Sequence, residues 1–491
     1  MTAGECATDD EVTVTDRVLD RTALVPPPRR QPGEPVVGLA AVLTLLTGAF
    51  LPILSFFVIN VALPSIGSDL HAGAAALQLV VASYGIANAV LVVVGGRLGD
   101  AFGRRRLFLV GMTGFTVFSL LCGLAPSVPT LLAARVGQGA FAALMTPQVL
   151  ATIMAVLAGE QRGRAIGLFG AAGGIAAAAG QVLGGALVSA DLFGLGWRTV
   201  FLFNVPVALV ALVLAWRMLP ESRADVRIPV DAVGAALLAI TLVLLLLPMS
   251  EGRPLGWPVW IWLVLAAVPP AAVGWAGHQV RSERSGRVPL IPPSVLALRH
   301  MRLGLVNAVA YFGTFGGFMF AFALATQGEA GMSALEGGLT LLPLAVAFLL
   351  VSVFGPNLQR RWGAGIIARG WAIQVVGYAA LAGFVHAEWP DVTPVNLALP
   401  MAVVGLGGGM VMMPLFGVVL AQVPPAQAGL GSGILITTQQ TCIALGAATI
   451  GTLYLAWAGG SPGQGDALAL VSLGIAAISM LALPVSLALR R

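Results

Sequence analysis

The sequence GGRLGDAFGRRR, residues 95–106, places one acid and four arginines between two runs that carry almost no charge. Its glycines permit a sharp reversal of the chain and a close approach of neighbouring helices. Asp100 can accept hydrogen bonds from an arginine and from a helix N-terminus, where the helix dipole favours an anion. We therefore expect an ionic cluster in a tight turn, formed by Gly96, Arg97, Gly99, Asp100, Gly103, Arg104 and Arg105.

Arg135 is the only arginine that lies within a long apolar run rather than beside one. An arginine in the hydrocarbon core of a membrane is costly and usually has a function. Gln138 follows one helical turn later, and polar groups of the first apolar run are further potential partners. We therefore expect Arg135 to be a functional residue.

These residues belong to a chain of 491 residues that is 58% hydrophobic and 10% charged. A soluble globular domain carries about 25% charged residues, so this chain has too few to cover a water-facing surface. Its basic residues are all arginines, are dispersed between apolar runs, and form no basic stripe that could bind nucleic acid. The composition predicts an integral protein of the lipid bilayer with no nucleic-acid partner.

The apolar runs predict how often the chain crosses the membrane. A bilayer core of about 30 Å is crossed by about 20 apolar residues in an α-helix, and strands are excluded because their exposed edges cannot be satisfied in lipid. We therefore expect an all-α polytopic membrane protein with fourteen transmembrane helices. The runs are 36–63, 77–96, 106–125, 129–156, 164–189, 199–218, 230–249, 258–277, 303–326, 334–356, 365–386, 395–420, 430–457 and 466–488.

The positions of the arginines predict the orientation. If the chain starts in the cytoplasm and changes sides with each run, every arginine except Arg135, Arg198 and Arg253 lies in or beside a cytoplasmic segment. Positive residues accumulate on the cytoplasmic side of membranes. We therefore expect a multi-pass protein of the cell membrane with both termini in the cytoplasm. The exclusive use of arginine is typical of a GC-rich genome and favours a bacterial source.

Two parts of the chain resemble each other. FGPNLQRRWGAG, residues 354–365, ends an apolar run with paired arginines, and the segments 164–187 and 429–452 are both rich in glycine. We therefore expect two repeated bundles with a substrate site at their interface, as in alternating-access transporters. The predicted organisation is a cytoplasmic tail at 1–35, a six-helix bundle at 36–218, a linker region with two inserted helices at 219–302, and a second six-helix bundle at 303–491.

Five segments resemble the motifs of one family, in the order expected there. They are NVALPSI (60–66), GGRLGDAFGRRR (95–106), RVGQGAFAALMTP (135–147), WRTVFLFNVPVAL (197–209) and VPLIPPSVLALR (288–299). On these motifs the chain resembles the major facilitator superfamily, and within it the fourteen-helix drug:proton antiporters. The resemblance implies the major facilitator fold and secondary active export of a small amphipathic compound, such as an antibiotic, by proton antiport. It also implies that residues 95–106 act as a gate and that Arg135 takes part in proton coupling or charge balance.

Two positions depart from the pattern of that family. Ser55 stands where the family typically has an aspartate, and Gly180–Gln181 stands where its antiporters have Gly-Pro. No Asp or Glu lies well inside any predicted span. Coupling through Asp100 and Arg135, a charge supplied by the substrate, and uncoupled transport therefore all stay open.

The substrate cavity is expected among polar and aromatic residues of the central spans, namely Ser55, Phe57, Asn60, Asn88, Gln138, Gln148, Gln181, Gln439 and Gln440. The chain has no GxxxxGK[ST] phosphate loop, metal-ligand pattern or catalytic triad, so we expect no ATP, cofactor, metal site or enzymatic activity. The alternative function is an importer or facilitator of a metabolite, including an anionic one. A sensor that keeps the fold without transport is a third.

Overall fold

The computed structural model describes residues 38–222, 231–252, 255–363, 365–420, 423, 428–459 and 463–490, and every regular element in these ranges is a helix. The expected tail, 1–35, lies outside them. The side chains of Asn60 and Gln181, although in helices, are also outside the described set. The prediction of an all-α protein is confirmed for this part of the chain.

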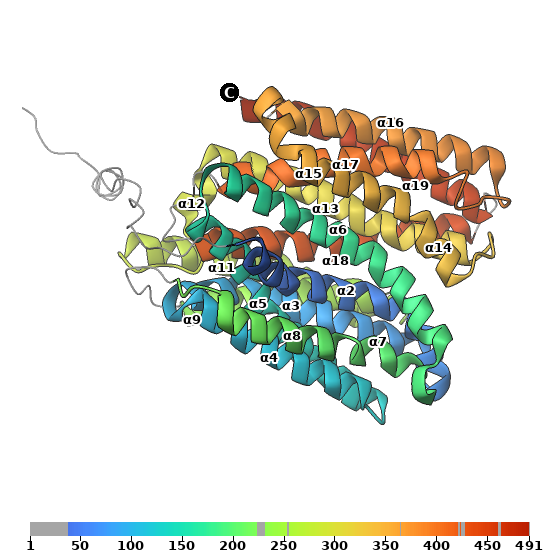
Figure 1. Ribbon diagram of the computed structural model, residues 1–491, viewed down its shortest axis with the longest axis horizontal. Helices are drawn as coiled ribbons and strands as arrows, with labels where there is room; N and C mark the ends of the chain where they lie inside the picture. Colours follow the sequence, from blue (N-terminus) through green and yellow to red (C-terminus); the bar gives the residue numbers. More distant parts are fainter. Residues whose placement is uncertain are drawn as a thin grey trace, which may run out of the picture. The chain divides into compact units, whose positions relative to one another are not determined.

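The first half of the chain builds one helical bundle (Figure 1). Within it α3, α4 and α5 pack against one another, and α2 packs against α6 and α8. Two short 3-10 turns, η1 (Leu192–Gly194) and η2 (Gly196–Arg198), precede α7. The helices are α2 (Leu39–Asp69), α3 (Ala74–Phe102), α4 (Arg104–Gly123), α5 (Val128–Val156), α6 (Gly159–Ala190), α7 (Thr199–Leu202) and α8 (Asn204–Met218).

Two inserted spans follow, and a second bundle completes the fold. The insert consists of α9 (Ala232–Glu251), α10 (Val259–Ala266) and α11 (Val268–Arg284), and a short α12 (Pro293–Ala297) leads out of it. In the second bundle α13 packs against α18, and α16 packs against α17 and α19. Its elements are α13 (Arg299–Gln327), α14 (Ala334–Thr340), α15 (Leu342–Trp362), α16 (Gly365–Glu388), α17 (Ala398–Leu420), α18 (Ala428–Ala458), α19 (Gly463–Leu487) and η4 (Ala488–Arg490).

The helices agree with the expected number of spans. In the described ranges, thirteen helical segments are long and apolar enough to cross a membrane, and each coincides with one expected span. The remaining expected span, 164–189, lies in α6, which is a continuous helix of 32 residues. The fold is therefore two six-helix bundles with two inserted spans. The exact domain boundaries, 36–218, 219–302 and 303–491, stay a prediction.

Three expected spans each contain a one-residue irregularity, at Phe203, Ala267 and Leu341, where the backbone stays right-handed helical. The irregularities fall between α7 and α8, between α10 and α11, and between α14 and α15. A proline lies in the first turn of each following helix, namely Pro206, Pro269 with Pro270, and Pro343. Proline lacks an N–H donor and its ring clashes with the preceding turn, so it starts a helix more readily than it continues one. Hydropathy alone does not show such irregularities.

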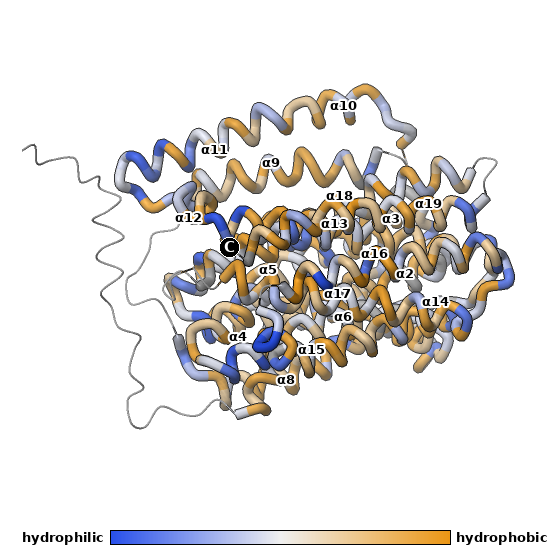
Figure 2. Tube along the Cα trace, turned by 90° about the horizontal axis from the view of Figure 1, so that it is seen from above, coloured by the Kyte–Doolittle hydropathy of each residue, from blue (hydrophilic) through white to orange (hydrophobic). Residues whose placement is uncertain are grey.

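Burial separates central helices from peripheral ones. In α17, 78% of the apolar window is buried, against 6% of the window that spans α10 and α11. Figure 2 shows α9, α10 and α11 as an outer layer, in which α9 contacts α3 and α18. Large apolar side chains on the outside of the bundle, such as Val213, Leu263 and Leu481, are exposed. A protein surface that faces hydrocarbon needs no polar face.

Glycine allows the central helices of both bundles to touch. A Cβ on Gly139 of α5 would lie 2.3 Å from the carbonyl oxygen of Tyr84 on α3. A Cβ on Gly446 of α18 would lie 1.8 Å from the carbonyl oxygen of Gly313 on α13. No larger residue tolerates these distances, and small residues let membrane helices approach closely. The central helices that carry the candidate site are thus held at backbone contact.

The turns between α3 and α4, between α11 and α13, and between α15 and α16 lie at one end of the helices, at the left of Figure 1. We call it the arginine-rich end, defined by the arginines of residues 97–106, 281–302 and 360–361. The other end carries α7 and α14 (Figure 1).

Candidate functional site

Asp100 joins the two bundles at the arginine-rich end. It lies near the end of α3 with 2% of its surface exposed. Its Oδ2 accepts a hydrogen bond of 3.2 Å from the backbone N–H of Leu430, in the first turn of α18. Its Oδ1 accepts a hydrogen bond of 2.8 Å from the guanidinium of Arg104. These are the two kinds of donor that the sequence predicted, and the helix N-terminus belongs to the second bundle.

Arg97 holds the connection between the inserted helices and the second bundle. Its side chain is buried, and Nε donates to the carbonyl oxygen of Leu290 at 3.0 Å. Nη2 donates to the carbonyl oxygens of Pro289 and Leu290, at 2.7 and 2.8 Å. We call residues 288–293 the connecting segment. The sequence led us to expect Arg97 as a partner of Asp100 and did not show these bonds. Their acceptors are main-chain oxygens that lie 192 and 193 residues after Arg97 in the chain.

Arg105 and Arg106 face the chain that follows α8. The backbone N–H of Arg105 donates to Glu221 at 3.2 Å, and its side chain donates to the carbonyl oxygen of Trp216. Arg106 lies 3.7 Å from Glu221 with most of its side chain exposed. Gly103, at the turn itself, has φ of 108°, and a Cβ there would lie 2.6 Å from the Glu221 carboxylate. Glycine alone fits both conditions.

Asp231, the N-cap of α9, holds the connecting segment from the other side. Its carboxylate accepts from the N–H of Gly234 at 2.8 Å and from the N–H of Leu290 at 3.2 Å, and lies 3.1 Å from Nε2 of His278. Partial burial raises the pKa of Asp231, but the two N–H donors and His278 outweigh that effect. The pKa of Asp231 therefore lies below its usual value.

Gln279 of α11 completes this clamp on the connecting segment. It is buried, and its Oε1 accepts from the N–H of Ile291 at 3.1 Å. Sequence reasoning missed the clamp because its partners on the connecting segment are main-chain groups, which carry no residue signature. The one available signal was Asp231 three residues before Gly234, a spacing typical of a helix N-cap.

Arg135 is fully buried in α5, and its partners are oxygen atoms and an aromatic ring. Nη1 donates to Oε1 of Gln138 at 2.8 Å and to the carbonyl oxygen of Ser55 at 3.4 Å. The guanidinium lies 4.3 Å from the centre of the Tyr84 ring. The titratable groups that act on it are Tyr84 and Cys122, which are neutral at neutral pH. In the described part of the chain, its charge therefore has no acidic partner.

Ser55 and its neighbours form a neutral hydrogen-bond network beside Arg135. The Oγ of Ser55 accepts from Nδ2 of Asn204 at 2.8 Å, which joins α2 to α8. Gln138 donates to Oγ of Ser119 at 2.8 Å. All four side chains are fully buried. At the position where the resemblance implied an aspartate, the protein thus has a hydroxyl group bonded to an amide, and sequence reasoning did not single out Asn204.

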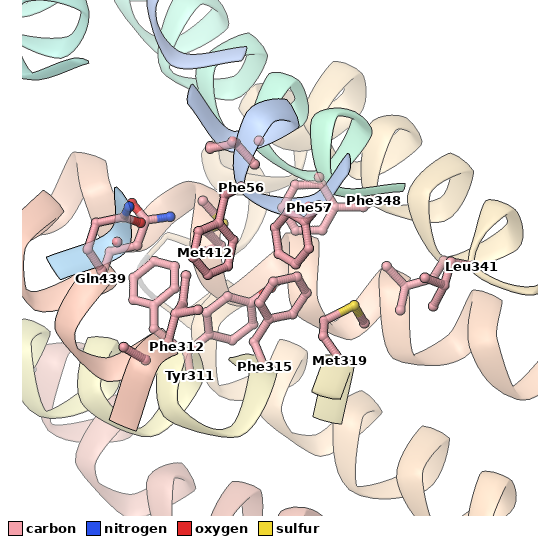
Figure 3. Close-up of a pocket in the computed structure, with 18 residues that line it drawn as sticks. Phe56, Phe57, Tyr311, Phe312, Phe315, Met319, Leu341, Phe348, Met412 and Gln439 are labelled. Carbon is pink, nitrogen blue, oxygen red and sulfur yellow. The ribbon is translucent and has the colours of Figure 1, made fainter. Parts of the chain in front are cut away.

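A cavity lies between the two bundles, at the middle of the helices (Figure 3). Helices α2, α3 and α6 line it from the first bundle, and helices α13, α15, α17 and α18 line it from the second. Three of the predicted cavity residues, Phe57, Gln439 and Gln440, are in its wall. Lining residues that sequence reasoning missed are Phe315, Met319, Leu344, Phe348 and Met412, because apolar residues in apolar helices give no signal of their own.

The other predicted cavity residues lie elsewhere or are not described. Ser55, Asn88 and Gln138 are buried but do not line the cavity. Gln148 supports the turn instead, because its Nε2 donates to the carbonyl oxygen of Gly95 at 2.8 Å and its Oε1 leaves no room for a Cβ on Gly99. The side chains of Asn60 and Gln181 lie outside the described ones.

Comparison with known proteins agrees with this architecture. A family model described as "Major Facilitator Superfamily" matches residues 45–447. A Streptomyces coelicolor protein named "Probable actinorhodin transporter" is 38% identical, over 89% of this chain and 74% of its own length. The cephamycin export protein of Amycolatopsis lactamdurans is 35% identical, over 92% of this chain and 93% of its own length. The solved structure of a human organic anion transporter superposes with a TM-score of 0.65 at 17% identity, over 91% of this chain and 99% of that one.

Proposed function

Because the chain belongs to the Major Facilitator Superfamily, we propose that it is a secondary active exporter of a small amphipathic compound, such as an antibiotic or secondary metabolite. Relatives that share more than a third of its residues over most of the chain are named for transport of actinorhodin and export of cephamycin. Export of this kind confers resistance or self-protection on the cell. The protein is a transporter, and the reaction it performs is the movement of substrate across the membrane.

The observation that carries this proposal is the position of the central cavity between two repeated bundles. Its wall takes side chains from both bundles, and the contact between Asp100 and α18 closes the bundles against each other at the arginine-rich end. Alternating access moves one bundle against the other around a site of this kind. The excess of arginine supports a cytoplasmic location for that end, with both termini of the chain on the same side.

The gate that we propose consists of Gly96, Arg97, Gly99, Asp100, Gly103, Arg104 and Arg105. When α18 moves away from α3, Asp100 loses the N–H of Leu430 while Arg104 stays beside it on the same turn. Two alternative sets of bonds for one carboxylate make a bistable element, as an alternating-access gate requires. Gly99 and Gly103 leave room for Gln148 and Glu221 beside the turn.

Proton antiport is the coupling that we propose. Protonation of Asp100 removes the charge that the N-terminus of α18 stabilises, so it favours opening of the gate. Arg135 supplies a fixed positive charge on the other side of the cavity wall. None of the described residues that line the cavity is a carboxylate, so a proton path depends on the gate or on the substrate.

A second function, import or facilitated diffusion of a metabolite, is favoured by one observation. Proton-driven exporters need a titrating acid within the membrane, and Ser55 replaces the one that the resemblance implied. Flux of the substrate down its own gradient requires no such acid.

The test is accumulation of a compound panel in a drug-sensitive bacterial host, with and without the protein, before and after addition of a protonophore. We expect lower accumulation of at least one compound, restored by the protonophore. The control is an empty vector, with the protein verified in the membrane. Flux that follows the gradient of the compound and ignores the protonophore would instead establish the second function.

A further inference from the structure

Two amide side chains in the cavity wall have no partner in the protein. Gln439 and Gln440 of α18 line the cavity, and neither amide group makes a hydrogen bond to any described residue. Many other polar side chains of the membrane region bond backbone or neighbours, as Asn204 does through Nδ2 and Gln138 does through Nε2. Gln439 is buried and Gln440 is half-buried. Because both amides line the cavity, they are available for a ligand that offers acceptors and donors.

The described residues that line the cavity are all uncharged, and a buried positive charge, Arg135, lies near them. Phe56 of the wall lies 6.4 Å from Tyr84, measured between ring centres, and the guanidinium of Arg135 lies 4.3 Å from the centre of the same Tyr84 ring. Because Arg135 has no acidic partner among the described residues, its charge makes the potential in the cavity positive. A low dielectric constant strengthens that effect.

Aromatic rings give the cavity two facing walls. Figure 3 shows Phe56 and Phe57 of α2 on one side, opposite Tyr311, Phe312 and Phe315 of α13. The rings of Tyr311 and Phe315 are nearly parallel, with 12° between their planes. The other neighbouring pairs meet edge to face, with 87° between Phe56 and Phe57 and 77° between Tyr311 and Phe312. The cavity therefore offers both ring faces and ring edges, which are the two contacts that an aromatic ligand prefers.

We propose that this cavity selects flat, multi-ring aromatic compounds that carry carbonyl or hydroxyl groups and no positive charge. The inference rests on the proposed export function and names its substrate class. Ring faces attract cations, but here no carboxylate offsets the loss of hydration, and Arg135 repels a second positive charge. The amides of Gln439 and Gln440 bond the oxygen atoms of the ligand, and the rings stack on its faces.

The cavity must widen to hold such a compound. Its volume is about 60 Å³, whereas cavities that hold drug-sized ligands measure about 300–1,000 Å³. The thioether side chains of Met319 and Met412 in its wall are flexible enough to move aside. Movement of one bundle against the other during transport supplies the rest.

The test compares two fluorescent three-ring compounds of nearly the same shape, uncharged acridone and the cation N-methylacridinium. Cells that express the full chain should accumulate acridone at least about threefold less than cells with an empty vector, a difference within the range of one or two hydrogen bonds. Their accumulation of N-methylacridinium should not change.

Variants of the two glutamines test which atoms make the selection. Gln439→Leu and Gln440→Leu should each bring acridone accumulation back toward that of the empty vector. Gln440→Glu, which adds the missing carboxylate, should start export of N-methylacridinium. Thr449→Val is the matched control, because Thr449 is an exposed residue of the same helix whose hydroxyl bonds only the carbonyl oxygen of Leu445. That variant should transport like the wild type.

Binding to the purified full-length protein in lipid nanodiscs, measured by the fluorescence anisotropy of both compounds, should show the same preference for acridone. Export of N-methylacridinium by the wild type, or export of other compounds of the panel but not of acridone, overturns the substrate class and leaves the export function standing. If no compound is exported by protein verified in the membrane, the export function fails and the substrate class fails with it.

Discussion

Two contacts between the bundles at the arginine-rich end are built differently. Between α3 and α18, Asp100 accepts the N–H of Leu430 in a setting that excludes water. Between α6 and α15, Glu160 pairs with Arg360 at 2.9 Å, and the two side chains are 46% and 59% exposed. The first contact is a buried charge at a helix N-terminus, and the second is an ion pair in solvent.

Burial decides which contact can act as a lock. An exposed ion pair contributes little because water and salt screen it, whereas a buried charge that loses its partner is strongly destabilised. The segment 354–365 repeats the arginines of residues 95–106 but has no acid. The repeat thus preserves the turn without the lock, and we infer that the contact between α3 and α18 is the one that switches.

Packing beside the two contacts agrees with this difference. At the α3–α18 contact, a Cβ on Gly433 would lie 3.2 Å from the Cα of Val93, so the helices touch. Beside the α6–α15 contact there is a cavity of about 300 Å³, lined in part by Gly163, Gly167 and Gln359. A Cβ on Gly167 would nevertheless lie 2.8 Å from the carbonyl oxygen of Ser352, so α6 and α15 also touch, and it is the exposed ion pair that borders open space.

The largest effect should come from Asp100→Asn, which keeps the size of the side chain and removes its charge. The N-terminus of α18 then faces a neutral group, and the buried guanidinium of Arg104 loses its counter-ion. Removing one partner of a buried ionic contact costs about 3–5 kcal/mol, so the initial rate of efflux from preloaded cells should fall at least about tenfold.

Glu160→Gln is the matched control, since it removes the same charge from the exposed contact. Immunoblots of membranes must show equal amounts of both variants. If Asp100→Asn transports at the rate of the wild type, the buried contact between α3 and α18 is not a lock. Burial then does not distinguish the two contacts in function.

A smaller effect is expected from Asp231→Asn, which tests whether the buried contact depends on the inserted helices. Arg97 bonds the carbonyl oxygen of Leu290, and Asp231 bonds the N–H of the same residue. A weaker bond at Asp231 therefore makes the connecting segment less rigid, and with it the acceptors that position Arg97 of the gate. A hydrogen bond to a charged group is worth about 1.5–3 kcal/mol, less where it is partly exposed. We therefore expect transport to fall about fivefold or less.

The control for that variant is Glu283→Gln, a half-buried acid of α11 that accepts a hydrogen bond from Ser294 just beyond the connecting segment. It changes the same charge on the same insert, and its effect should be smaller. Thermal unfolding of the purified protein should show a lower midpoint for Asp231→Asn than for the control. Equal midpoints and equal transport would show that the clamp does not support the gate.

The sequence predicted the features that depend on local properties of the chain. The thickness of the bilayer requires about 20 apolar residues in each helical span, so the hydropathy of the sequence shows the spans. Asp100 and Arg104 are four residues apart in one turn, so their contact was also predictable. The irregularities before Pro206, Pro269 and Pro343 leave the backbone helical, and hydropathy does not show them.

The features that the sequence could not predict depend on distant partners. The bonds of Arg97 end on main-chain oxygens of the connecting segment, and the hydroxyl of Ser55 finds an amide 149 residues away. Phe315 and Phe348 line the cavity while many other phenylalanines only pack, and nothing local distinguishes them. Such contacts depend on which helices pack against each other. The hydropathy of a single helix does not determine its neighbours.

The smallest effect should come from Arg360→Gln, which breaks the exposed ion pair with Glu160. This variant tests whether the exposed contact matters as little as its exposure predicts. The hydrogen bond from Arg360 is the main reason why the pKa of Glu160 lies below its usual value, yet Arg164 also bonds Glu160 at 2.7 Å and stays in place. Efflux should therefore stay within about twofold of the wild type, and any difference should shrink further in high salt. A loss as large as that of Asp100→Asn would mean that exposure does not predict which contact locks, and that the α6–α15 contact takes an equal part in closing the gate.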